Sequence, residues 1–256
     1  NKELFDVNFK DWRSDPRQLY NIDKIPNPVL RATHRQSKKR LLAYANSQLS
    51  KALDINTLTI GFARRAATYK RAQLIFKDVD RLIDIGKGKI QIIFSGKAHP
   101  KDEGGKSLIK NIVKSSKYFS GHIKIIYLEN YNMWLGRLIT SGVDVWLNTP
   151  LRPNEASGTS GMKASLNGVP NLSVLDGWWS EGCIDGVNGW AVGNPNEISD
   201  ESDADHLYNL IENNVIPSYY GDKDDWSTMM KESIKTGISY TSHRMVTDYN
   251  NQYYKL

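Results

Sequence analysis

Apolar runs of five or six residues recur through the middle of the chain, and segments with helical periodicity separate them. The runs lie at 58–62, 89–94, 123–128, 143–147 and 171–175. Their content of β-branched residues is typical of strands. Strands that alternate with helices form parallel sheets with right-handed crossovers, and nearly continuous apolar strands suit a sheet covered on both faces. The sequence therefore predicts an α/β fold, with a Rossmann-like parallel sheet and helices on both faces.

The segments outside this alternation set the expected boundaries. Residues 1–28 are polar and interrupted by prolines, so we expect an extended lead-in that packs on the rest. A basic helix should follow, from Asn27-Pro28 to about Leu53, with its cations on a solvated surface. We expect a lead-in and basic helix over 1–55, a Rossmann-like domain over 56–240 and a C-terminal helix over 241–256. The Gly- and Trp-rich stretch 177–193 is interpreted as a loop, and further helices are expected at 203–215, 224–235 and 244–254.

Composition favours a globular protein without a membrane span. Of the 256 residues, 39% are hydrophobic and 24% are charged, which is ordinary for such proteins. No apolar run approaches the roughly 20 residues that cross a bilayer, and no targeting segment is visible at the start. The single cysteine, Cys183, excludes an internal disulfide and fits a reducing compartment, so we expect a cytoplasmic protein. Because the first residue is Asn1 and not methionine, we expect a processed chain or a piece of a larger one.

The formal net charge of +6 permits an anionic partner. The cations cluster at 31–40 and 64–71, and no nucleic-acid-reading module accompanies them, so we expect no nucleic-acid partner. The second cluster is better explained by phosphate binding. The five histidines have no metal-ligand spacing, and no metal site is expected.

Charged and small residues lie directly after the carboxyl ends of several predicted strands. In parallel α/β sheets, ligands gather at the carboxyl ends of the strands. Four segments fall at those ends and should converge on one site: 61–70, 95–98, 129–133 and 152–163.

The stretch Glu155-Ala-Ser-Gly-Thr-Ser-Gly-Met-Lys163 is the most informative of these segments. Small residues at the mouth of a helix let backbone N–H groups converge on an anion, and the helix dipole adds to the attraction. A lysine in the first turn, if partly desolvated, becomes a nucleophile toward an aldehyde. The residues alone leave two readings open: an anion cradle beside a Schiff-base lysine, or a Gly/Ser turn before a helix with a solvated lysine.

The same stretch resembles the pyridoxal-phosphate lysine motif of the α-glucan (glycogen, starch and maltodextrin) phosphorylases. The resemblance continues through Asn167-Gly168 and Leu175-Asp-Gly-Trp-Trp179, a form found in shorter bacterial and archaeal members. It implies that Lys163 is the covalent attachment point of pyridoxal 5'-phosphate. It further implies contacts to the cofactor phosphate from Thr159 and Ser160, and to the glucosyl unit from Glu155, Ser157 and Gly158.

Two other segments resemble the same family. Gly61-Phe-Ala-Arg-Arg-Ala-Ala-Thr-Tyr-Lys-Arg71 is similar to the segment that holds the substrate and cofactor phosphates. The resemblance gives the phosphate-holding roles to Arg65 and Lys70, with Arg64 in support near the cofactor. An arginine fork and a lysine point charge are a suitable pair for inorganic phosphate. Glu129-Asn-Tyr-Asn-Met133 is similar to a segment that binds the cofactor phosphate, which implicates Tyr131 and Asn132.

The resemblance implies the C-terminal domain of a two-domain GT-B type glycosyltransferase. The implied reaction is reversible phosphorolysis of an α-1,4-glucan to glucose 1-phosphate. Only one of the two domains is recognisable, so we expect an incomplete enzyme that needs a missing N-terminal domain. The resemblance is compatible with a homo-oligomer. Two alternatives stay open: a retaining nucleotide-sugar glycosyltransferase such as a glycogen synthase, and a non-catalytic glucan-binding fragment.

Overall fold

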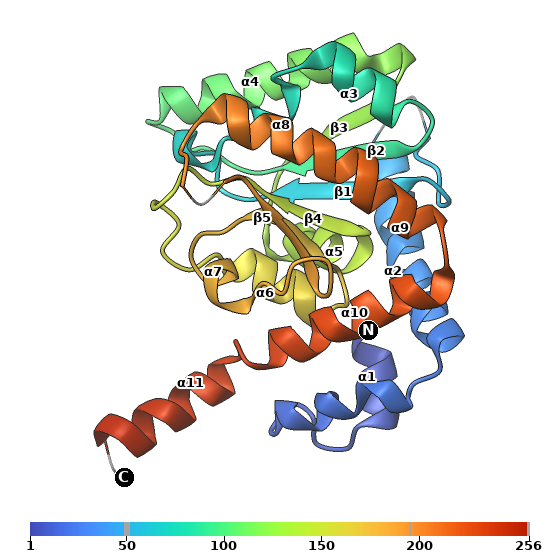
Figure 1. The fold of residues 1–256 in the computed structure, drawn as a ribbon, viewed down its shortest axis with the longest axis vertical. Coiled ribbons are helices and arrows are strands. Elements are labelled where there is room, and N and C mark those ends of the chain that lie inside the picture. The colour runs from blue at the N-terminus through green and yellow to red at the C-terminus, as the bar shows by residue number, and fades with distance from the viewer. Residues whose placement is uncertain (49–51, 195, 255–256) are drawn as a thin grey trace.

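A computed structural model describes residues 1–48, 52–194 and 196–254. Six parallel strands form one sheet in the order β3-β2-β1-β4-β5-β6 (Figure 1). The predicted α/β class with a parallel sheet is confirmed. The strands are β1 (Leu58–Ala63), β2 (Ile90–Ser95), β3 (Lys124–Leu128), β4 (Val145–Asn148), β5 (Asn171–Val174) and β6 (Gly189–Val192).

Helices cover both faces of the sheet. In chain order, the helical elements are α1 (Lys2–Asn8), η1 (Pro16–Lys24), α2 (Asn27–Ser47), η2 (Thr68–Lys70), η3 (Leu74–Phe76), α3 (Val79–Gly86), α4 (Glu103–Tyr118), η4 (Phe119–Gly121), α5 (Met133–Gly142), α6 (Thr159–Leu166), α7 (Trp179–Gly182), α8 (Asp200–Leu210), η5 (Ile211–Val215), α9 (Ile216–Tyr220), α10 (Lys223–Ile238), α11 (Ser242–Tyr249) and η6 (Asn250–Tyr254). Elements η5 and η6 are π-helical, and the other η elements are 3₁₀ helices.

The two faces of the sheet have separate hydrophobic cores because successive strand side chains point to opposite sides. On one face, Ile60 and Phe94 pack with residues of α3, α4 and α8. On the other face, Ile93 and Trp146 pack with residues of α2, α5 and α6. Figure 1 shows α3, α4 and α8 on one side of the strands and α5 and α6 on the other. All six residues of β1 are buried, which explains why its sequence is apolar except for Thr59.

The strand order creates a crevice at the centre of the sheet. From β1 the chain proceeds outward through β2 to β3, and from β4 it proceeds outward the other way through β5 to β6. The connections therefore diverge between β1 and β4, and a ligand can enter at the carboxyl ends of these two strands. The segment after β1 carries the 64–71 cations, and the segment after β4 leads to Glu155 and α6.

Several local expectations were wrong. The lead-in is helical where an extended segment was expected, because α1 and η1 bury Phe5, Leu19 and Ile22 in the core. The predicted 177–193 loop contains α7 and β6, which extends the sheet. The basic helix ends at Ser47 and not near Leu53. Residues 49–51, within that predicted helix, and 255–256, at the end of the predicted C-terminal helix, lie outside the described residues.

The basic helix is also not uniformly solvated. Lys38 is only 2% exposed, and its Nζ donates to Asp144 Oδ2 at 2.5 Å and to the Thr57 carbonyl at 2.7 Å. Asp144 also accepts the Thr59 N–H at 2.8 Å and lies 3.1 Å from Nε2 of His34. Although burial raises the pKa of the Asp144 carboxyl, the nearby Lys38 and His34 together hold it below its usual range. This cluster joins α2 to the amino ends of β1 and β4.

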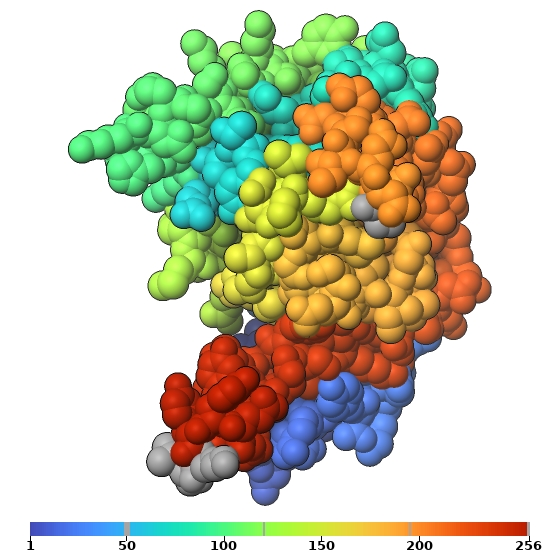
Figure 2. Space-filling view, turned by 60° about the vertical axis from the view of Figure 1, so that its left-hand side comes forward, coloured from blue at the N-terminus to red at the C-terminus, as the bar shows by residue number. Residues whose placement is uncertain are grey.

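The last two helical elements contribute little to the core. No residue of α11 is buried, and Met245, Val246 and Tyr249 are exposed. Figure 1 shows α11 running away from the sheet, and Figure 2 shows this C-terminal segment in red near the blue N-terminal lead-in. Over the ranges 1–48, 52–194 and 196–254, no helix has the length and apolar character needed to cross a bilayer.

Candidate active site

Three charged side chains meet in the crevice between β1 and β4. The Glu155 carboxylate accepts a hydrogen bond from Arg64 Nη2 at 2.9 Å and another from Lys70 Nζ through the same oxygen, Oε2. The exposed fractions are 8% for Arg64, 5% for Lys70 and 7% for Glu155. Two buried cations therefore face one carboxylate, which leaves a local excess of positive charge.

Backbone hydrogen bonds to neighbouring segments hold Arg64 and Glu155, and the Tyr69 ring lies beside Lys70. The Arg64 N–H donates to the Ser95 carbonyl at 3.2 Å, which extends the pairing of β1 with β2. Lys70 ends η2, and its Nζ lies 4.4 Å from the centre of the Tyr69 ring. The Glu155 N–H donates to Asp176 Oδ2 at 2.9 Å, so the segment after β4 is tied to the segment after β5.

Arg64 has donors that the described part of the protein leaves unused. Its Nε and Nη1 atoms are buried without a hydrogen-bond partner there, and so is the Ser160 hydroxyl. Burial lowers the pKa of the Arg64 guanidinium, and the Glu155 carboxylate partly offsets this effect. An arginine stays charged in proteins, and buried donors without partners are costly. The arrangement suits an anion that binds beside Arg64.

Helix α6 begins at the same edge of the sheet. Its N-cap, Gly158, has a φ of 89°, and a Cβ added there would lie 3.1 Å from Trp178 Cδ1. A glycine is therefore required for this turn. The first amides of a helix have no partner within it and attract negative charge. The amides after Gly158 thus add donors near the unpaired Ser160 hydroxyl.

Tyr131 lies close to the same charges. Burial raises the pKa of its phenol, and the positive charge of Arg64 opposes the rise. A Cβ added to Gly136 would lie 2.9 Å from the Tyr131 hydroxyl, so this glycine in α5 gives the ring room. Asn132 has a structural part, because its side chain accepts the Leu135 N–H at 2.9 Å and caps α5.

Lys163 is exposed and stands one turn further along α6. It lines a cavity of about 540 Å³ between α6, α5, α2 and the lead-in, together with Trp134 and Arg137 of α5. Among the described residues, no ion pair to the Lys163 amine is formed. Pockets of 300–1,000 Å³ are typical of ligand sites, so the amine has space for a ring-sized group beside it.

The structure brings some predicted residues together and separates others. Arg64, Lys70 and Glu155 form one cluster, with Tyr131 nearby. Arg65 is exposed, whereas its neighbour Arg64 turns inward. The other predicted residues that are exposed are Asn132, Ser157, Thr159 and Lys163.

Two buried residues with structural importance for the cluster were missed. Asp176 holds the backbone of Glu155, as described above. Arg71 has a φ of 44°, a left-handed conformation that is uncommon for residues other than glycine. Its guanidinium donates to the carbonyls of Thr149 at 3.0 Å and Pro150 at 2.9 Å, and to Asp203 at 2.6 Å. Arg71 therefore fastens the segment after β1 to the segment after β4. Its place in the 64–71 basic cluster was the available sequence signal.

Replacement of Arg71 by lysine is expected to lower the free energy of unfolding by about 1–3 kcal/mol. A lysine keeps the positive charge beside Asp203 but cannot reach both carbonyls with a planar fork, so buried acceptors lose their partners. Denaturant unfolding of both proteins measures this. The exposed Arg13→Lys change is the control, and an equally stable R71K protein would show that the fork is unimportant.

Among the described residues, no group of three or more His, Cys, Asp and Glu side chains is arranged to hold a metal ion.

Comparison with known proteins places these elements in a family. The carbohydrate phosphorylase family model matches residues 4–181. Maltodextrin phosphorylase of Thermococcus litoralis is 46% identical over 267 residues, covering 96% of this chain and 32% of the relative. Glycogen phosphorylase of Aquifex aeolicus is 42% identical, covering 99% of this chain and 40% of the relative. Glycogen phosphorylase of Mycobacterium tuberculosis is 43% identical, covering 80% of this chain and 25% of the relative.

The chain thus spans between a quarter and two-fifths of the length of these relatives. The family has the GT-B glycosyltransferase fold, of which the parallel sheet described above is an α/β unit. The family model and these relatives show that this chain belongs to the carbohydrate phosphorylase family.

Proposed function

We propose that this chain forms the cofactor- and phosphate-binding part of an α-1,4-glucan phosphorylase. The reaction is the reversible transfer of a glucosyl unit from the glucan to phosphate, which yields glucose 1-phosphate. The observation that carries the proposal is the buried Arg64, whose Nε and Nη1 donors have no partner in the described structure. It lies beside Lys70 and Glu155 at the point where ligands enter such sheets.

The residues present fit pyridoxal 5'-phosphate. The unpaired donors of Arg64 and Ser160 suit its phosphate, and the cavity of about 540 Å³ lined by Lys163 has room for its ring. Helix α5 lies between the Arg64 cluster and this cavity. Tyr131, just before α5, lies near Arg64, and Trp134 of α5 lines the cavity. The residues that would hold the cofactor are Lys163, Thr159, Ser160, Tyr131, Asn132 and Arg64. When bound, the cofactor supplies a phosphate that exchanges a proton with the substrate phosphate.

The cations of this chain perform the electrostatic part of the reaction. Lys70 and Arg64 are fixed before substrate arrives, and preorganised charges that face developing negative charge are usually the largest catalytic contribution. Arg65, exposed at the rim, is free to turn toward the substrate phosphate. The Glu155 carboxylate offsets part of the positive charge of the two buried cations. Together with Ser157 and Gly158, it contacts the glucosyl unit.

The relatives are much longer than this chain, so we propose that other parts of a phosphorylase complete the site. Glycogen and inorganic phosphate incubated with this chain alone should yield no glucose 1-phosphate above background. Robust release would show that the chain is sufficient.

Covalent capture of the cofactor tests the proposal directly. The purified chain is incubated with pyridoxal 5'-phosphate, reduced with borohydride and weighed by intact-mass spectrometry. We expect one added cofactor, mapped to Lys163 by peptide analysis, and its loss in Lys163→Ala. Lys110→Ala, an exposed lysine of α4, is the matched control and should label fully. Equal labelling of wild type and K163A would refute the assignment.

A further inference from the structure

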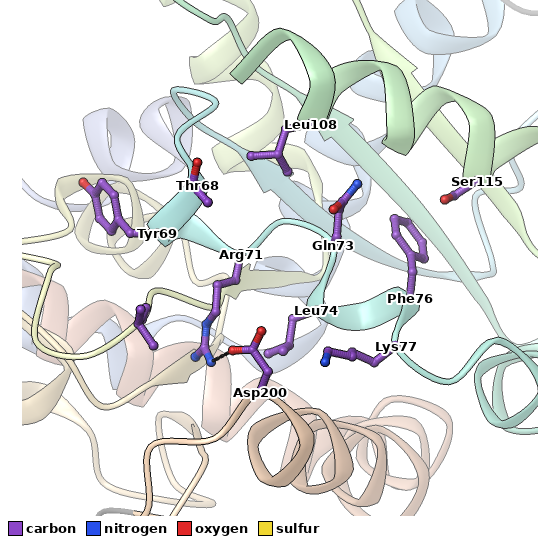
Figure 3. Close-up of a pocket in the computed structure, with 11 residues that line it drawn as sticks. Thr68, Tyr69, Arg71, Gln73, Leu74, Phe76, Lys77, Leu108, Ser115 and Asp200 are labelled. Atoms are coloured by element: carbon purple, nitrogen blue, oxygen red, sulfur yellow. Dashed lines mark hydrogen bonds and ion pairs between the residues drawn. The ribbon is translucent and has the colours of Figure 1, made fainter. Parts of the chain in front are cut away.

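A groove of about 790 Å³ lies next to the candidate active site. One wall is the segment from η2 to η3, and the opposite wall is α4. The base includes the beginning of α8. Figure 3 shows Leu108 of α4 pointing toward the segment that carries Gln73, with Ser115 further along the same helix. None of these residues belongs to the site proposed above.

The groove contains charged side chains, but their charges are paired. Arg71 Nη1 donates to Asp200 at 2.8 Å, and its Nη2 donates to Asp203 at 2.6 Å; Figure 3 marks the Arg71–Asp200 contact. Lys77 forms an ion pair with Glu201. An anion would have to displace these carboxylates. The groove therefore favours a neutral ligand, in contrast to the Arg64 cluster and its unpaired donors.

Uncharged polar groups in the groove are free to bind such a ligand. Within the described part of the protein, the side chains of Thr68, Gln73 and Ser115 make no hydrogen bond. The apolar side chains of Phe76 and Leu108 line the same groove. A ligand that offers many hydroxyls and also apolar C–H surface can satisfy both kinds of wall, because pockets combine apolar lining with a few directed polar groups.

The position of the groove connects it to the proposed reaction. Thr68 and Tyr69 line it, and Lys70 directly follows them in η2. The Tyr69 ring lies 4.4 Å from Lys70 Nζ. One short helical turn therefore separates the groove from the candidate phosphate site, so a chain seated in the groove lies near the site of phosphorolysis.

We propose that this groove binds glucosyl units of an α-1,4-glucan, a neutral polyhydroxyl chain, and holds the polymer beside the active site. The inference rests on the proposed function for the identity of the polymer. Thr68, Gln73 and Ser115 donate to and accept from its hydroxyls. Phe76 and Leu108 cover its apolar faces.

Affinity for maltoheptaose, measured by isothermal titration calorimetry on the full chain, tests this. The double variant Thr68→Val, Gln73→Ala removes two polar side chains from the groove and should weaken binding about tenfold. Neither side chain makes a hydrogen bond within the described protein, so the fold should be retained, as circular dichroism will show. Gln18→Ala, an exposed glutamine of η1, is the matched control and should bind as wild type does.

Unchanged maltoheptaose affinity in the double variant would overturn the proposal, as would competition by inorganic phosphate at constant ionic strength, because that would make the groove an anion site. Capture of pyridoxal 5'-phosphate at Lys163 is measured in parallel. If the double variant binds maltoheptaose more weakly but wild type does not capture the cofactor at Lys163, the proposed function is wrong and the groove is still a glucan-binding site. If wild type captures the cofactor and the double variant binds maltoheptaose as wild type does, only the proposal of a glucan-binding groove is wrong.

Discussion

Replacement of Asp144 by alanine is expected to lower the free energy of unfolding by about 3–5 kcal/mol, because removal of one member of a buried ion pair leaves its partner charged and without compensation. The Lys38 ammonium, 2% exposed, would keep only neutral acceptors, the Thr57 carbonyl and the Tyr219 hydroxyl. The Thr59 N–H would also lose its acceptor at the start of β1. Denaturant unfolding at neutral pH measures the change.

The matched control is Asp205→Ala, which removes an exposed carboxylate that pairs with Arg81. This control should leave the free energy of unfolding nearly unchanged, since exposed pairs contribute little. An Asp144→Ala protein as stable as the control would show that the buried cluster is unimportant.

The contribution of Asp144 also has a defined pH dependence. Its carboxyl has a folded-state pKa below the usual range, whereas the pKa of an aspartate in an unfolded chain is about 3.9. A group with a depressed folded pKa stabilises the native state above the unfolded pKa, and this stabilisation is lost as the pH falls toward the folded value. The difference in unfolding free energy between wild type and Asp144→Ala should therefore be constant above about pH 5 and shrink below about pH 4.

The second large effect is expected at Glu155. Its replacement by alanine leaves Arg64 and Lys70 buried with no carboxylate, and we expect a loss of about 3–5 kcal/mol in a phosphate-free buffer. An anion can take the place of the missing carboxylate. Inorganic phosphate at 100 times its dissociation constant would restore about 2.7 kcal/mol by binding only the native state. Unfolding in chloride and in phosphate at equal ionic strength measures both quantities.

Phosphate should stabilise Glu155→Ala more than wild type, because the native carboxylate competes with the anion for the same two cations. Glu201→Ala, which removes the exposed partner of Lys77, is the control and should respond to phosphate as wild type does. Identical phosphate responses of Glu155→Ala and wild type would argue against an anion site at Arg64.

The fold class followed from the sequence because it depends on local patterns. The five apolar runs became β1 to β5, since residues such as Ile60 and Ile93 are buried on opposite faces of one sheet. The sixth strand was missed because Gly189–Val192 is short and lies in a stretch rich in glycine. The burial of Lys38 was also missed, since its partner Asp144 is 106 residues away and no local pattern joins them.

The site was predictable as a set of segments but not as a set of contacts. Strand ends and motif spacing placed 61–70 and 152–163 at one edge, where the structure joins Arg64 and Lys70 to Glu155. The sequence could not show which of two adjacent arginines turns inward, because the outcome depends on the turn after β1. The structure buries Arg64 and exposes Arg65. The contacts of Arg71 were likewise hidden, since they link segments about 80 residues apart.

The unsupported C-terminal helix has a consequence for experiments on this protein. Because α11 buries no residue, its opening exposes almost no apolar surface and should cost little free energy. Its backbone amides should exchange with deuterium long before those of β1, all of whose residues are buried. Limited proteolysis should accordingly cut first beyond Thr241 and leave a trimmed product that unfolds at the same temperature as the intact chain.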